Sequence, residues 1–97
     1  MIFVYQFNED LEEFEELKTK ENVALFELLQ SDKIFLFVDV NNEKVWVWEG
    51  KNTPLRMKFI SAQEAPKIRN IHDITFTISS VDEGDETAAF KILVGLL

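Results

Sequence analysis

The chain is 97 residues long and 46% hydrophobic, which suits one packed domain and leaves no room for a second. It contains no cysteine, and this excludes disulfides, thiol catalysis and thiolate metal sites. The formal net charge of −8 argues against nucleic acid as the main partner, because phosphate contacts dominate that affinity. We therefore expect a single domain over residues 1–97 in a reducing compartment.

The apolar segments are too short for a membrane protein. The longest unbroken apolar run inside the chain is Ile34–Val38, whereas a spanning helix needs about 20 apolar residues. The apolar start Met1–Phe7 runs directly into the acidic segment Asn8–Glu16 and lacks the basic beginning of a signal peptide. The sequence predicts a soluble, cytoplasmic protein without a membrane span. Five basic residues and a single acid lie in residues 51–70, a candidate docking surface for an acidic partner.

The first third of the chain predicts one strand, one ambiguous segment and one helix. The segment Met1–Phe7 is rich in β-prone residues and predicts a strand. In Asp10–Leu17 an apolar residue recurs at every third position, as in a helix, while the dense glutamates also suit an exposed edge strand. Both alternatives stay open. The segment Glu21–Gln30 has an apolar stripe and no Gly or Pro, which predicts a helix.

Two clear strands follow, Lys33–Val40 and Glu43–Glu49, joined by Asn41-Asn42. Asparagine tolerates left-handed backbone, so a tight hairpin turn is predicted. In the second strand valines alternate with tryptophans, and both faces are therefore apolar. Such a strand is central and covered on both sides, which predicts a sheet with helices on both faces.

A long helix is predicted over Pro54–Asn70. Pro54 suits the first turn, with Asn52 or Thr53 as the cap. We expect Pro66 to kink the helix or to end its regular part. The predicted buried face is the apolar stripe at helical spacing formed by Leu55, Phe59, Ala62 and Pro66.

The opposite face of this helix carries Met57, Ile60 and Ile68 among polar residues. Apolar anchors within a polar rim are typical of a recognition surface. We expect these residues to be exposed. The alternative is that another element covers them.

The C-terminal quarter predicts a half-buried strand over Ile74–Val81, a turn over Asp82–Asp85 and a short helix over Glu86–Val94. The acids of the turn are oxygen ligands that suit calcium, although acids also favour the start of a helix, so we interpret them as a solvated turn. His72 is the single histidine, and we interpret it as a loop residue. No oriented acid–base pair or nucleophile is recognisable, so no enzyme is expected.

Three blocks of sequence resemble domains of the gelsolin family. KVWVWEGKN (residues 44–52) resembles the aromatic strand that ends in W-x-G before the long helix. VDEGDETAAFKILVG (residues 81–95) is similar to the closing segment, with Gly84, Glu86 and Phe90 at its marked positions. LLQSDKIFLFVD (residues 28–39) is similar to the segment that leads into the first hairpin strand. Their order and spacing agree from about Val23 to the C-terminus.

This resemblance implies an α+β fold, with a central mixed sheet of about five strands between one long and one short helix. Such domains bind actin by laying the long helix in a hydrophobic cleft. One copy implies monomer binding, sequestration or capping in the cytoskeleton, as a monomer or weak homodimer. The alternative is a structural interaction module of a trafficking or scaffold complex that does not bind actin. The expected contact residues are Arg56, Met57, Ile60, Gln63, Glu64 and Lys67.

Calcium and phosphoinositide are the other ligands that the resemblance implies. Asp32 stands where many relatives have a calcium-binding aspartate. Met57 occupies the position of their helix glutamate, and its thioether cannot ligate a hard cation. Calcium control is therefore not expected, with Asp32 left as the single candidate metal ligand. The basic residues of the long helix are the candidates for phosphoinositide.

Overall fold

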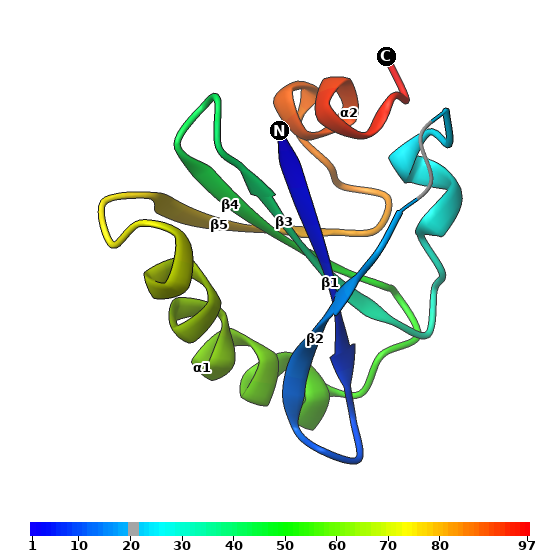
Figure 1. The fold of residues 1–97 in the computed structure, drawn as a ribbon. Coiled ribbons are helices and arrows are strands. Elements are labelled where there is room, and N and C mark those ends of the chain that lie inside the picture. The colour runs from blue at the N-terminus through cyan, green and yellow to red at the C-terminus, as the bar shows by residue number, and fades with distance from the viewer. Residues whose placement is uncertain (20–21) are drawn as a thin grey trace.

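The structure, a computed structural model, describes residues 1–19 and 22–97 (Figure 1). It consists of strands, two α-helices and one short 3-10 helix. In chain order these are β1 (Ile2–Asn8), β2 (Glu13–Leu17), η1 (Leu25–Leu28), β3 (Ile34–Asp39), β4 (Lys44–Glu49), α1 (Leu55–His72), β5 (Thr77–Asp82) and α2 (Ala88–Val94).

The strands form one five-stranded sheet in the order β2-β1-β3-β4-β5. Neighbours are antiparallel except for β4 and β5, which are parallel. The helix α1 connects this parallel pair, and Figure 1 shows it on one face of the sheet, with α2 on the other. The predicted mixed sheet between a long and a short helix is confirmed. No helix of the described residues has both the length and the apolarity to cross a membrane.

The hairpin of β3 and β4 forms the centre of two cores, one on each face. Val45 and Val47 face α1, whereas Trp46 and Trp48 face α2 and η1. All four side chains are buried. Strands have a side-chain period of two, so the alternation of valine with tryptophan supplies both faces. The predicted central strand, covered on both sides, is confirmed.

The segment left open between helix and strand contains the edge strand β2. Phe14 points inward and packs edge-on against Phe7, with ring centroids 5.3 Å apart. Glu13, Glu15 and Glu16 stay exposed. Charged residues on an edge strand discourage pairing with another chain. Of the two alternatives for this segment, the exposed edge strand is therefore confirmed.

The helix predicted over Glu21–Gln30 is wrong for the described part of that segment, and Glu21 lies outside the described residues. Asn22 has a φ of 73°, a left-handed conformation that a right-handed helix cannot include. Only the 3-10 turn Leu25–Leu28 forms. Its leucines pack against the core on the α2 side, so tertiary packing outweighs helix propensity here.

The turn between β3 and β4 exists as predicted, but its left-handed residue is Glu43, with a φ of 54°. The side-chain nitrogen of Asn42 donates to an Asp39 carboxylate oxygen over 2.7 Å. Asx side chains commonly stabilise turns through such local bonds. Asn42 therefore stabilises the turn through a side-chain hydrogen bond, and neither asparagine adopts the expected left-handed conformation.

Both ends of α1 differ from the prediction. Pro54 itself is the N-cap residue, and no side chain caps the helix. The Thr53 hydroxyl instead donates to the carbonyl oxygen of Gly50 over 2.7 Å. Pro66 does not end the helix, which continues to His72. His72 is therefore a helical residue and not a loop residue.

The last two elements begin later than predicted. Ile74 is exposed and precedes β5, which starts at Thr77. The helix α2 starts at Ala88, and Thr87 caps it by accepting a hydrogen bond from the Phe90 backbone over 3.3 Å. Threonine is a favoured N-cap residue, so the acids before it belong to the turn.

Candidate functional site

The turn that leads into α1 depends on a close approach between Gly50 and Ser31. A Cβ atom on Gly50 would lie 2.3 Å from the carbonyl oxygen of Ser31, which only glycine avoids. The Gly50 amide donates to the Lys33 carbonyl over 3.0 Å, and the Asn52 amide donates to the Ser31 carbonyl over 2.9 Å. These bonds fix the chain direction just before the helix begins.

Glu83, which directly follows the edge strand β5, ties the same turn to that strand. Its carboxylate accepts from the Lys51 amide over 2.9 Å and from the Ser31 hydroxyl over 2.8 Å. The bond from Lys51 and then the one from Ser31 lower the pKa of this carboxyl below its ordinary value. Hydrogen bonds to the charged form stabilise it, so Glu83 is held as a carboxylate.

Glu86 makes the corresponding tie to β4. Its carboxylate accepts from the indole nitrogen of Trp48 and from the Gly84 amide, both over 2.9 Å. Burial alone raises the pKa of this group, but the hydrogen bonds, that from Trp48 first, outweigh burial and the pKa is lowered. Phe90 is fully buried and packs edge-on against Phe37 and Trp46.

The three sequence blocks therefore meet in one structure. We call Ser31, Trp48, Gly50, Glu86 and Phe90 the motif unit. Its aromatic members lie on the α2 side of the sheet. The Ser31 hydroxyl and the Trp48 indole nitrogen both donate hydrogen bonds to carboxylates of the same chain. This unit builds the fold and positions the start of α1.

The inner face of α1 contains Met57, Ser61 and Ala65, all buried. Ile60 and Ile68 pack against the same core. Small residues at 61 and 65 let the helix lie close to the sheet, and the Ser61 hydroxyl is satisfied by the Lys58 carbonyl at 2.9 Å. The expectation that this face is exposed is wrong.

The outer face of α1 is the stripe that the sequence analysis assigned to the core. Leu55 is 83% exposed and Phe59 is 64% exposed. Ala62 is exposed as well, and Pro66 is half-buried. The helix has two apolar stripes at the same spacing, and periodicity alone cannot tell which one faces the sheet. The predicted orientation of the helix is therefore reversed.

The six predicted contact residues divide according to this orientation. Met57 is buried, and Ile60 is half-buried and packs against the core, so neither is the exposed anchor that was expected. Arg56 and Gln63 are exposed beside the apolar stripe. Lys67 is exposed and pairs with the half-buried Glu64 over 2.8 Å. The contact role of these polar residues stays a prediction.

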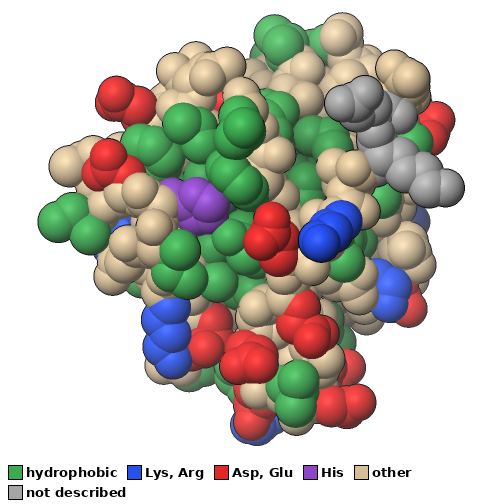
Figure 2. Space-filling view, viewed as in Figure 1, with side chains coloured by type: hydrophobic (Ala, Val, Ile, Leu, Met, Phe, Trp, Pro, Cys, Tyr) green, Lys and Arg blue, Asp and Glu red, His purple; other side chains and the backbone are tan. Residues whose placement is uncertain are grey.

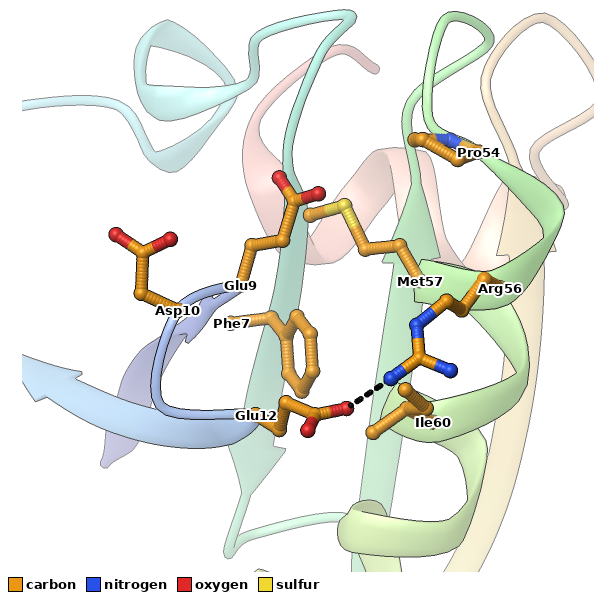
Figure 3. A pocket seen from close by; sticks show the side chains of 8 residues that line it. All are labelled: Phe7, Glu9, Asp10, Glu12, Pro54, Arg56, Met57 and Ile60. Atoms are coloured by element: carbon orange, nitrogen blue, oxygen red, sulfur yellow. Dashed lines mark hydrogen bonds and ion pairs between the residues drawn. The ribbon is translucent and has the colours of Figure 1, made fainter.

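A pocket of about 340 Å³ opens beside the first turn of α1 (Figure 3). Arg56 lies at its rim and pairs with Glu12 of the β1–β2 turn over 3.0 Å. Figure 2 shows the acids of this region (red) gathered at the lower end of the view. The pocket is lined by Phe7, Glu9, Asp10, Glu12, Pro54, Arg56, Met57 and Ile60.

The surroundings of Asp32 do not fit a calcium site. Asp32 is exposed and lines a second pocket, to which α1 contributes Met57. Calcium takes six to eight oxygen ligands. Within residues 1–19 and 22–97 no group of three His, Cys, Asp or Glu side chains could hold a metal ion.

His72 fastens the last turn of α1 to the sheet. Its Nε2 lies 2.8 Å from the Tyr5 hydroxyl, and its ring packs on Phe3 with centroids 4.6 Å apart. Burial first, and then the charge of Glu16, raise the pKa of Tyr5. Figure 2 shows the histidine (purple) among hydrophobic side chains (green). Its role is structural.

The architecture is shared with solved structures. No protein-family model and no curated protein matches the chain. Thorarchaeota ProGel, solved in a crystal of its complex with rabbit actin, is similar over 98% of this chain and 100% of its own, with a TM-score of 0.80 and 23% identity. The chain has a gelsolin-like fold.

A second similar structure is Thorarchaeota 2DGel3, also solved in a complex with rabbit actin. It matches 92% of this chain at a TM-score of 0.66 and 24% identity, and this chain spans 43% of its length. The gelsolin-like fold predicted from the three blocks is thus confirmed.

Proposed function

We propose that this chain binds actin through the outer face of α1 and limits filament assembly. The observation that carries the proposal is the exposed apolar stripe that begins with Leu55 and Phe59 on a helix anchored along its other face. Two proteins with the same fold have been crystallised in complexes with rabbit actin, which supports actin as the partner.

The stripe has the composition that an interface needs. Burying an exposed leucine or phenylalanine contributes about 1.5–3 kcal/mol per side chain. Two such residues one helical turn apart fit a hydrophobic cleft in the helix-in-groove mode. Arg56, Gln63 and Lys67 supply the polar rim that surrounds such anchors. The binding free energy is therefore concentrated in Leu55 and Phe59.

The proposed binding face is one side of one helix, so one copy contacts one actin molecule. Sequestration of monomers and capping of filament ends both fit this stoichiometry. A sequestering protein raises the unpolymerised actin in proportion to its own concentration. A capping protein stops elongation at far lower concentrations. Pyrene-actin elongation and steady-state sedimentation, measured across a range of concentrations of this protein, distinguish the two.

The test of the binding face is Phe59→Asp, with Ile92→Asp as its matched control. Phe59 and Ile92 are both 64% exposed, but Ile92 lies on α2, on the other side of the sheet. Placing a carboxylate at a hot spot costs about 2–4 kcal/mol, so Phe59→Asp should weaken actin binding at least ~30-fold. Ile92→Asp should bind as the wild type does. Circular dichroism and thermal melting should show both variants folded.

Equal binding by Phe59→Asp and the wild type would contradict the assignment of this face. A wild-type chain that leaves polymerisation unchanged at large excess would contradict actin binding itself, and would favour the interaction module that does not bind actin. Ile60→Asp is unsuitable for this purpose because Ile60 packs against the core.

A further inference from the structure

Pro66 lies inside α1, six residues before its end. A proline nitrogen carries no hydrogen, so it cannot donate to the carbonyl four residues earlier. In α1 that acceptor is the carbonyl oxygen of Ala62. The helix thus contains one backbone acceptor in its interior that lacks its regular helical donor.

This acceptor lies on the outer face. Residues 55, 59, 62 and 66 are spaced so that they share one side of the helix, and Ala62 is exposed. A helical carbonyl points along the axis toward the residue four positions later, which places the Ala62 oxygen between the side chains of Ala62 and Pro66. The proline ring crowds this oxygen from the same side of the helix.

We propose that the Ala62 carbonyl oxygen is a hydrogen-bond acceptor for the docked partner. The partner group is a hydrogen-bond donor of actin: a backbone N–H, a hydroxyl or a side-chain amide. This inference rests on the proposed function. A partner that covers the stripe removes water from the oxygen, and a buried acceptor without a donor is unfavourable. The partner that fits therefore carries a donor at this point.

The acceptor also sets the register of docking. Leu55 and Phe59 are apolar contacts, which tolerate sliding along a groove because the hydrophobic effect is non-directional. A hydrogen bond near the middle of α1 is directional and fixes the position of the helix along its axis. The stripe and the oxygen together define one binding pose.

The experiment compares Pro66→Val with Pro66→Ala in actin binding and in thermal unfolding. Both variants restore the N–H at position 66, but only valine keeps an apolar side chain of similar size. Both variants restore the helical hydrogen bond and should therefore melt at a higher temperature than the wild type. If the partner uses the free oxygen, both should also bind actin about fivefold more weakly. Wild-type affinity in Pro66→Val would overturn the inference, whether or not Pro66→Ala is weaker.

A semisynthetic variant separates the oxygen from the shape of the helix. An ester in place of the amide between Ala62 and Gln63 keeps Pro66 and makes the Ala62 oxygen a weaker acceptor. We expect its affinity to fall by a similar factor, whereas an ester between Ile60 and Ser61, on the inner side, leaves the affinity unchanged. Equal affinities of the two esters would overturn the inference.

Failure of the inference and failure of the proposed function give different results. If the wild type binds actin, Phe59→Asp does not, and Pro66→Val binds normally, then only the role of the oxygen is lost. If the wild type does not bind actin, both are lost.

Discussion

The motif unit and the outer face of α1 both contain large apolar side chains, but these side chains are used in opposite ways. In the motif unit Phe90 and Trp48 are buried, and the indole and carboxylate groups bond one another. On the outer face Leu55 and Phe59 lie in solvent. The residues by which the chain resembles a family thus hold the fold together. The residues with which it would bind a partner belong to no motif.

The largest expected effect is a loss of stability, and it is tested by the same phenylalanine-to-alanine substitution in each region. Phe90→Ala should lower the free energy of unfolding by about 3–5 kcal/mol, since it empties a fully buried site. Phe59→Ala, on the exposed side, should change it by less than about 0.5 kcal/mol. Urea unfolding followed by circular dichroism measures both. Similar losses in the two variants would break the contrast between the regions.

The next effect tests the close approach in the motif unit. Gly50→Ala places a Cβ against the backbone of Ser31, and the strain should cost about 1–3 kcal/mol. Gly84→Ala is the matched control, because its Cβ meets nothing within 4 Å and only its φ of 89° is unfavourable. We expect the control to cost about 1 kcal/mol. A Gly50→Ala protein as stable as the wild type would show that Ser31 moves freely.

The smallest effect concerns the bond between Trp48 and Glu86. The folded state lowers the pKa of Glu86 below the ordinary value of 4.5. Its contribution is therefore present above that value and is lost as the pH falls through the folded pKa. Glu86→Gln should lower stability at pH 7 by about 1 kcal/mol, and the difference from the wild type should shrink in acid. Unfolding curves measured from pH 7 to pH 3 check this, and a difference that does not vary with pH would contradict it.

Much of the fold could be predicted because the relevant information is local. The alternation of valine and tryptophan from Val45 to Trp48 indicated a strand with two buried faces, and the structure has one. The failed helix before Gln30 shows the limit of this reasoning. The apolar stripe of this segment suggested a helix, but the packing of its leucines on the α2 side decided the backbone conformation.

The candidate site was harder to predict, for a different reason. The helix α1 has apolar residues on two opposite sides, Met57 with Ile60 and Leu55 with Phe59. A helical period assigns each pair to a face but does not tell which face meets the sheet. The signal that could have decided the orientation is the size of the residues that follow Met57 on the same side of the helix. Ser61 and Ala65 are small, and a helix that packs closely needs small residues at its contact.

The position of the tryptophans has a practical consequence. Trp46 and Trp48 are the two tryptophans of the chain, and both lie on the side of the sheet away from α1. Their emission therefore reports the environment of the α2 side, away from the outer face of α1. Intrinsic fluorescence is thus an unfolding signal for the free protein. A dye on a cysteine introduced into this cysteine-free chain, beside Phe59, would report docking independently.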